Sequence, residues 1–284
     1  PISRMTNPTP AQVQHQGATA CTVHEPRNGQ APQRTFLLGH ALGCDHTMWD
    51  ALTQHLAAEN RVVCCDQFGH GASQDPQLVP TGPYTMAQLA DEAAALIDAL
   101  QLGPVVWVGL SMGGMVGQEL ALRHPDKVSA LVLANTTTHY PFEARQGWDT
   151  RIATIREQGL QAIVDMAMTR WFHDAFRAAQ PEVVAHWRAK VLGCNTAGYI
   201  ACCEAIRDVD TLDRLHRIQV PALVIAGELD LGTPPAMARA IAGQISGAQL
   251  VVLPQASHLS VLEQPQAFIQ TVDTWLQGLE AGTA

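Results

Sequence analysis

The chain has 284 residues, of which 47% are hydrophobic and 15% are charged, and its formal net charge is −9. This apolar content is enough for a large core and excludes a globally disordered chain. An acidic chain without a cluster of lysine and arginine is poorly suited to nucleic acid or to an anionic membrane surface, so we expect neither as a partner.

Seven cysteines, an odd number, are spread along the chain. They lack the C-x-x-C spacing with nearby histidines that is typical of a metal site, so no metal is predicted. We expect no cofactor either. Buried free thiols pack as small hydrophobic groups and favour a reducing compartment. The sequence shows no signal peptide, no run of eighteen apolar residues and no lipidation motif, and we therefore expect a cytoplasmic protein.

Short apolar runs rich in Val, Leu and Ile recur along the chain and predict buried strands. These runs are Thr35–Leu38, Arg61–Cys65, Val105–Val108, Val128–Leu133, Ala222–Ala226 and Gln249–Leu253. They show almost no alternation between polar and apolar residues. Strands that are covered on both faces have this pattern, so a parallel sheet is favoured over an antiparallel one.

Longer amphipathic segments lie between these runs and predict helices. They are Thr47–Ala58, Thr85–Leu100, Met112–Arg123, Pro235–Ala242 and Gln264–Leu279. Regular alternation of strand and helix is typical of right-handed βαβ units. The sequence therefore predicts an α/β fold with a mostly parallel, doubly wound sheet.

One segment, residues 141–215, interrupts this alternation because it contains helical patterns and no convincing strand. The helical patterns are Glu143–Glu157, Leu160–Phe172, Pro181–Leu192 and Thr196–Arg207. We predict that this segment is a helical cap inserted between two strands of a core formed by residues 11–140 and 216–280. A cap at one sheet edge would cover whatever lies at the strand ends. The alternative is that these helices only extend the core.

The stretch Gly109-Leu110-Ser111-Met112-Gly113 joins a predicted strand to a predicted helix. In this context G-x-S-x-G is typical of a nucleophile elbow, in which the serine occupies a sharp turn and the glycines allow the strand and helix to approach closely. The alternative is a tight turn with a capping serine. We predict that Ser111 is a nucleophile.

A serine hydroxyl needs a base, and the base needs an acid that orients it. Where the elbow occurs, the chain order is serine, then acid, then histidine. Asp230 follows the strand at 222–226, and His258 follows the strand at 249–253. Since such groups gather at the carboxyl ends of parallel strands, we predict Asp230 as the acid and His258 as the base. Glu228 and Asp208 are the rival acids.

Cleavage of an ester or lactone also needs hydrogen-bond donors for the developing oxyanion. The backbone N–H of Met112 directly follows the nucleophile and is the first predicted donor. The second donor belongs in the loop after the first inner strand, which reads Gly39-His40-Ala41-Leu42-Gly43. We predict the N–H of Leu42 for this role.

These motifs resemble the α/β-hydrolase superfamily from about Thr35 to Leu276. Three stretches are more narrowly similar to the 3-oxoadipate enol-lactonases. They are Gly109–Gln118, Gly198–Asp210 and Val220–Pro265. The resemblance implies a serine hydrolase that opens a small, carboxylate-bearing enol-lactone through an acyl-enzyme, as in the β-ketoadipate pathway of aromatic catabolism.

The sequence departs from that resemblance at two places. His40-Ala41 stands where the family often has His-Gly or Asn-Ser before the oxyanion residue, which would alter the shape of the oxyanion hole. Phe68 stands where the family commonly has an arginine, so one cation near the elbow is missing.

An anionic substrate needs a cation near the site of a chain with net charge −9. Arg151 lies three residues after Trp148, which places both on one helix face, and Arg170 is adjacent to Trp171. Both arginines resemble cap positions of the lactonases, so we predict these four residues as substrate-binding. The alternative for the arginines is a solvated helix face.

Other functions remain open on the sequence alone. A general carboxylesterase and a cofactor-free perhydrolase would share the same fold and the same three catalytic residues. A ligand receptor of this fold, which signals through a protein partner, is an analogy at the level of fold alone. Haloalkane dehalogenation is disfavoured, because it requires an aspartate where this chain has Ser111.

Overall fold

The computed structural model describes residues 11–281. Its centre is an eight-stranded sheet with the strand order β1-β2-β4-β3-β5-β6-β7-β8. The strands are β1 (Val13–Gln16), β2 (Thr19–His24), β3 (Thr35–Gly39), β4 (Arg61–Asp66), β5 (Val105–Leu110), β6 (Val128–Ala134), β7 (Ala222–Gly227) and β8 (Gln249–Leu253). Strands β3 to β8 pair in parallel, and β2 pairs antiparallel with β1 and with β4.

The predicted fold class is confirmed, and all six predicted strands are present with ends within two residues of those expected. The sequence reasoning missed the antiparallel strands β1 and β2. The side chains of β1, VQHQ, are mostly exposed at the sheet edge, so this strand lacks the apolar run that marks a buried one.

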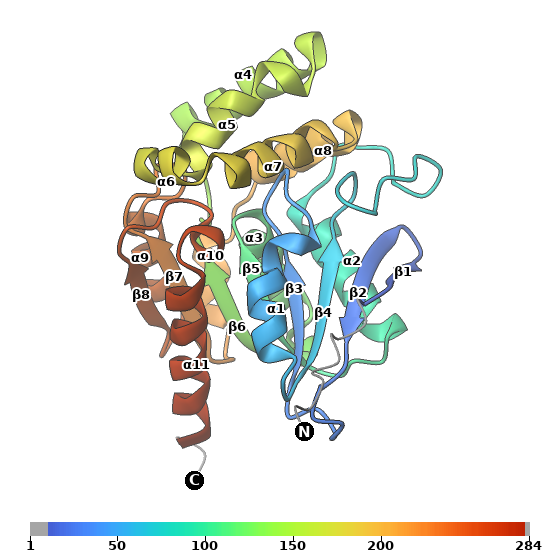
Figure 1. Ribbon diagram of the computed structural model, residues 1–284, viewed down its shortest axis with the longest axis vertical. Coiled ribbons are helices and arrows are strands. Elements are labelled where there is room, and N and C mark those ends of the chain that lie inside the picture. The colour runs from blue at the N-terminus through green and yellow to red at the C-terminus, as the bar shows by residue number, and fades with distance from the viewer. Residues whose placement is uncertain (1–10, 282–284) are drawn as a thin grey trace, which may run out of the picture.

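Helices cover both faces of the sheet (Figure 1). The core helices are α1 (Asp50–Leu56), α2 (Met86–Ala99), α3 (Met112–Arg123), α9 (Pro235–Gln244), α10 (Ser260–Glu263) and α11 (Pro265–Ala281). Helices α1 and α11 contact each other, as do α2 and α3. Short 3-10 turns complete the set, at His46–Trp49, Pro125–Lys127, Leu160–Ala162 and Leu212–Arg217.

The cap segment is helical and lies between β6 and β7 in the chain. Its helices are α4 (Phe142–Gln158), α5 (Val164–Trp171), α6 (Asp174–Ala179), α7 (Pro181–Leu192) and α8 (Thr196–Arg207). The helix expected over Leu160–Phe172 is divided into a 3-10 turn and α5, and α6 was not expected, because six residues are too few to show a helical period. Figure 1 shows the cap above one end of the sheet.

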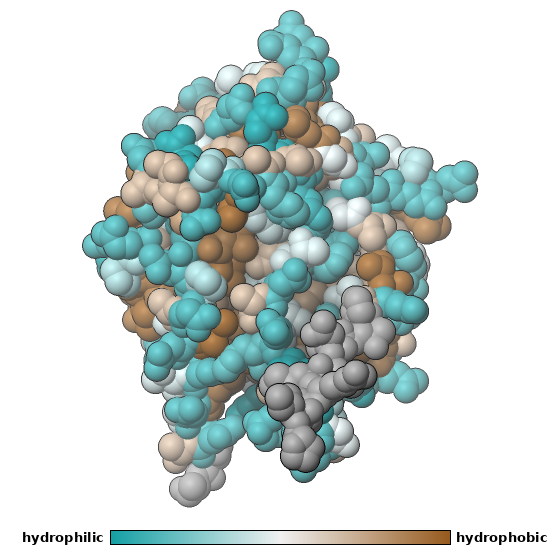
Figure 2. All heavy atoms as spheres, viewed as in Figure 1, coloured by the Kyte–Doolittle hydropathy of each residue, from teal (hydrophilic) through white to brown (hydrophobic). Residues whose placement is uncertain are grey.

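The seven cysteines are all buried free thiols. Burial raises the pKa of the Cys64 and Cys194 thiols to about 12, so these groups stay protonated at neutral pH. Polar side chains dominate the face of the molecule that Figure 2 shows, with hydrophobic patches between them. Within residues 11–281, no helix is both long and apolar enough to cross a membrane.

The loop after β4 supports the cap and contains a buried histidine. Gly69 lies so close to Gly198 of α8 that a Cβ on either would collide with the other backbone. His70 Nδ1 lies 2.9 Å from the Phe68 carbonyl oxygen, and its ring stacks on Tyr199. Burial, together with the nearby His40, lowers the pKa of His70 to about 3. The native fold therefore holds His70 neutral.

We expect this histidine to destabilise the fold in acid. The pKa of His70 is lower in the folded than in the unfolded state. Its contribution to the free energy of unfolding is therefore present above about pH 6.5 and is lost as the pH falls towards 3. Between pH 6.5 and 5 the loss amounts to about 1.6 kcal/mol. Urea unfolding at these two pH values measures the change in the free energy of unfolding. This change should be smaller in His70→Asn than in the wild type, and the asparagine amide can still donate to the Phe68 carbonyl.

The control for this prediction is His216→Asn, because His216 is exposed and lies outside this cluster. The pKa of His46 is raised by its hydrogen bond to Asp66. Because His46 is present in both the wild type and His70→Asn, its effect on the pH dependence cancels in the comparison. An unchanged pH dependence in His70→Asn would contradict the prediction.

Candidate active site

Ser111 sits between the end of β5 and the start of α3, next to the point where the strand order reverses between β3 and β5. Its backbone has φ +55° and ψ −114°, an uncommon conformation for a residue with a side chain. A Cβ on Gly109 would overlap the Gly113 carbonyl, and a Cβ on Gly113 would overlap the Gly39 carbonyl. The two glycines therefore allow the close packing that the turn requires.

The structure brings Ser111, His258 and Asp230 together, although 147 residues separate the first two. Ser111 Oγ lies 3.0 Å from His258 Nε2. The other ring nitrogen, Nδ1, lies 2.9 Å from Asp230 Oδ2. All three residues are buried. This geometry allows the imidazole to take the serine proton while the carboxylate holds the ring.

Asp230 is surrounded by hydrogen-bond donors. Its Oδ1 accepts from the N–H groups of Gly232 (2.8 Å) and Thr233 (2.9 Å), and its Oδ2 accepts from the Thr233 hydroxyl (2.7 Å) and from Asn135 Nδ2 (3.0 Å). Burial alone would raise the pKa of this carboxyl, but the His258 ring and the hydrogen bonds together hold it below its usual value. Asp230 is therefore ionised at neutral pH.

Asn135, which occupies the turn after β6, was not predicted as a site residue. Its side chain donates to Asp230 and to the Ser257 carbonyl oxygen, both at 3.0 Å, and it accepts a hydrogen bond from Ser260. The sequence signal was its position directly after a buried strand.

The two rival acids lie elsewhere. Glu228 is exposed, and its carboxylate accepts a hydrogen bond from the Gln255 N–H. Asp208 is exposed and pairs with Arg207 and Arg145. Neither carboxylate is bonded to the His258 ring.

The backbone N–H groups of Leu42 and Met112 have no hydrogen-bond acceptor within residues 11–281. His40, which is buried, fixes the peptide that carries the first of these groups. Its Nε2 accepts from the Gln67 N–H at 2.8 Å, so its Nδ1 bears the proton and donates to the Ala41 carbonyl, also at 2.8 Å. Since that carbonyl and the Leu42 N–H share one peptide plane, the histidine orients the donor.

A cavity opens at Ser111 and His258 between the sheet and the cap. Its walls are formed by Ala41, Leu42, Tyr140, Trp148, Arg151, Ala167, Arg170, Trp171, Ile206 and Gly232. All four side chains that the sequence analysis selected from the cap are among them. Tyr140, Ala167 and Ile206 were missed, because an isolated apolar or aromatic residue carries no signal of facing a cavity rather than a core.

Arg151 has an unusual environment for an arginine. Its guanidinium lies over the rings of Trp148, at 5.3 Å, and Tyr199, at 5.8 Å, and donates a hydrogen bond to the Tyr199 hydroxyl. Its buried Nε has no hydrogen-bond partner, and no carboxylate within residues 11–281 pairs with it. A cation that lines the cavity without a counter-ion can receive an anionic group there.

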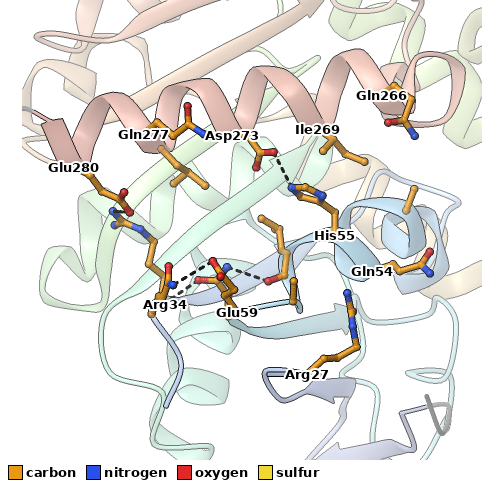
Figure 3. Close-up of a pocket in the computed structure, with 16 residues that line it drawn as sticks. Arg27, Arg34, Gln54, His55, Glu59, Gln266, Ile269, Asp273, Gln277 and Glu280 are labelled. Atoms are coloured by element: carbon orange, nitrogen blue, oxygen red, sulfur yellow. Dashed lines mark hydrogen bonds and ion pairs between the residues drawn. The ribbon is translucent and has the colours of Figure 1, made fainter. Parts of the chain in front are cut away.

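A larger hollow lies at the opposite, amino-terminal ends of β3 and β4, between α1 and α11 (Figure 3). It contains two ion pairs, with His55 2.7 Å from Asp273 and Arg34 3.4 Å from Glu280. It contains no serine or cysteine beside a base. In the part of the chain that the structure describes, no group of three or more His, Cys, Asp or Glu residues is placed to hold a metal ion.

Comparisons with known proteins agree with this architecture. The sequence profile of the alpha/beta hydrolase family matches residues 36–271. The 3-oxoadipate enol-lactonase 2 of Acinetobacter baylyi is 37% identical over 86% of this chain and 89% of its own length. The crystal structure of an enol-lactonase from Burkholderia xenovorans is 35% identical, covers 94% of this chain and 100% of that one, and has a TM-score of 0.86. A malate-bound thermophilic esterase from Thermogutta terrifontis is 30% identical, covers 92% and 94%, and has a TM-score of 0.82.

Proposed function

Because this chain belongs to the alpha/beta hydrolase family, we propose that it is a serine hydrolase of small carboxylate-bearing lactones, with 3-oxoadipate enol-lactone as its substrate. The reaction class is supported by the contacts between Ser111, His258 and Asp230. The substrate class is carried by one observation: Arg151 lines the same cavity, and no carboxylate within residues 11–281 pairs with it.

In the first half of the proposed reaction, Ser111 Oγ attacks the lactone carbonyl while His258 Nε2 takes its proton. The N–H groups of Leu42 and Met112 stabilise the oxyanion. Collapse of this intermediate breaks the ring C–O bond, and His258 returns the proton to the departing enol oxygen. This cleavage leaves an acyl group on Ser111. The enol then becomes a ketone, which favours ring opening.

In the second half, His258 takes a proton from a water molecule, which attacks the acyl-enzyme. The carboxylic acid leaves, and Ser111 regains its proton. Throughout the cycle Asp230 keeps the proton of the neutral imidazole on Nδ1 and stabilises the cation that forms twice.

The carboxylate of the substrate is held by Arg151, with Arg170 as a second cation and with Trp148 and Trp171 as apolar walls. Cations inside the cavity offset the repulsion between a substrate anion and a chain of net charge −9. The malate in the structure of the Thermogutta terrifontis esterase is a dicarboxylate, which supports carboxylate binding within this family. The general-esterase alternative draws its support from the same relative.

The test of the substrate class is Arg151→Met, which keeps an unbranched, flexible side chain but removes the guanidinium and its charge. We expect KM for the enol-lactone to rise about 10- to 100-fold, the equivalent of about 1.5–3 kcal/mol for a hydrogen bond to a charged group. For the methyl ester of the same lactone, which lacks the anion, KM should change less than about threefold. Initial rates on both compounds measure the difference.

The matched control is Arg145→Met. Arg145 belongs to the same helix, but it is exposed and pairs with Asp208 at 3.0 Å, so its loss should leave both KM values unchanged. Equal increases in KM for the charged and the neutral compound in Arg151→Met would contradict carboxylate recognition by this residue.

A further inference from the structure

Glu263 is a buried carboxylate that ends the short helix α10, five residues after His258. One oxygen, Oε2, accepts a hydrogen bond from the N–H of Ser257, the residue before His258. The other oxygen, Oε1, accepts from the N–H of His173, at 3.0 Å. His173 belongs to the cap, between α5 and α6. One carboxylate therefore joins the loop of the candidate base to the cap.

Two further hydrogen bonds cross the same boundary. The Leu259 N–H donates to the Trp171 carbonyl at 3.2 Å, and the Ser257 hydroxyl donates to the Arg170 carbonyl at 3.3 Å. The residues on both sides of His258 are thus bonded to the segment 170–173. We call this set of four hydrogen bonds, two to Glu263 and two between backbone or hydroxyl groups, the cap seam.

The cap seam joins two parts of the candidate active site. On one side it holds the loop whose imidazole lies 3.0 Å from Ser111 Oγ. On the other side it holds Arg170 and Trp171, which line the cavity. A displacement of either side would alter both the Ser111–His258 distance and the cavity wall.

Glu263 suits this position only as a carboxylate. Both of its partners are N–H donors, and a carboxylate accepts at both oxygens, whereas a glutamine would present its own N–H groups to one of them. Burial raises the pKa of Glu263, and the two N–H groups act in the opposite direction. The His173 ring also lies close to this carboxylate, with Nε2 4.0 Å from Oε1. A hydrophobic or neutral polar residue would avoid this burial cost but would not join the two segments.

We propose that Glu263 is a positioning residue, which through the cap seam holds both His258 against Ser111 and the Arg170–Trp171 wall of the cavity. This inference rests on the proposed function, because it assigns Glu263 a role in the same Ser111–His258 reaction. The role goes beyond fold stability, since it couples the rate of the reaction to the binding of substrate.

The test compares Glu263→Gln with Glu119→Gln. Glu119 is a similarly buried glutamate, but it pairs with Arg214 away from the cavity, so its loss controls for the cost of disturbing a buried carboxylate. We expect Glu263→Gln to lower kcat about tenfold for both the enol-lactone and p-nitrophenyl acetate, because the base is misplaced. KM for the lactone should rise about tenfold as the Arg170 wall shifts. Glu119→Gln should leave both constants within about twofold, although its free energy of unfolding also falls.

The outcomes separate the two proposals. An active wild type with equal effects of Glu263→Gln and Glu119→Gln would overturn the positioning role alone. A wild type that hydrolyses neither substrate and is not labelled at Ser111 by a fluorophosphonate would overturn the proposed function, and this role with it. If Glu263→Gln does not fold, Ser257→Ala tests the inference instead, because it removes one hydrogen bond of the cap seam, from the Ser257 hydroxyl to the Arg170 carbonyl. We expect this substitution to raise KM for the lactone about threefold. An unchanged KM would overturn the inference.

Discussion

Ser111→Ala is expected to lower kcat for lactone and ester hydrolysis by at least ~10⁴-fold, because Ser111 Oγ is the hydroxyl that lies 3.0 Å from His258 Nε2. The Thr233 hydroxyl lies 3.3 Å from the other ring nitrogen, Nδ1, and donates to Asp230. Alanine occupies the same backbone conformation as serine and leaves the glycine contacts of the turn unchanged. The free energy of unfolding should therefore stay within about 1 kcal/mol of the wild-type value. Rates on the enol-lactone and on p-nitrophenyl acetate, together with urea unfolding, measure both effects.

Ser129→Ala is the control for this substitution, since Ser129 is exposed on β6 and its loss should leave the rate unchanged. The labelling of the wild type by a fluorophosphonate should be lost in Ser111→Ala and kept in Ser129→Ala. Residual hydrolysis above about 1% of the wild-type rate in Ser111→Ala would exclude this serine as the nucleophile.

Asp230→Asn should lower kcat by ~10³- to 10⁴-fold with little change in the shape of the site. The carboxylate accepts from Gly232, Thr233 and Asn135 as well as from His258, all of which are donors. An asparagine has one oxygen and must turn its amide N–H groups towards some of them. If that amide faces Nδ1, it favours the ring tautomer with the proton on Nε2, which cannot accept the proton of Ser111.

The control for the acid is Glu228→Gln. Glu228 follows the same strand, but it is exposed and bonds to the Gln255 backbone, so its loss should leave kcat within about twofold. The kcat of the two variants on p-nitrophenyl acetate provides the comparison. A larger loss in Glu228→Gln than in Asp230→Asn would show that the acid has been assigned to the wrong residue.

The sequence predicted the sheet well because its inner strands are covered on both faces. Runs such as Val105–Val108 have no polar residue, and few other structures accommodate them between amphipathic helices. The same logic predicted that Ser111, Asp230 and His258 lie together, since each belongs to the turn or loop after a predicted strand and parallel strands end at one edge of the sheet. The end of a strand can be recognised from the local sequence. Parallel pairing in the sheet then brings the residues that follow different strands close together.

The residues that surround these three were harder to predict, because their roles depend on hydrogen bonds between distant segments. Asn135 bonds to Asp230 across 95 residues, and Glu263 bonds to His173 across 90. Nothing in the sequence near either residue indicates its partner. A side chain after a strand end can either position a neighbouring side chain or take part in the reaction. Only the three-dimensional structure distinguishes these two roles.

The cap illustrates the same limit in its helices. The spacing of Trp148 and Arg151 predicted that they share a face, and in the structure the guanidinium lies over the indole ring. The spacing did not predict that Tyr199, on another helix, would take the place of a carboxylate beside Arg151. The division into core and cap at residues 141–215 stays a prediction, although α4 to α8 fill that segment.

The most direct test of the proposed function is kcat/KM of the wild-type protein for 3-oxoadipate enol-lactone beside that for p-nitrophenyl acetate. A site with Ser111 as nucleophile and Arg151 as carboxylate receptor predicts a preference for the lactone of about 100-fold or more. Hydrolysis of the ester with little or no turnover of the lactone would contradict this substrate. The protein would then be an esterase, with the same nucleophile and a different acyl group.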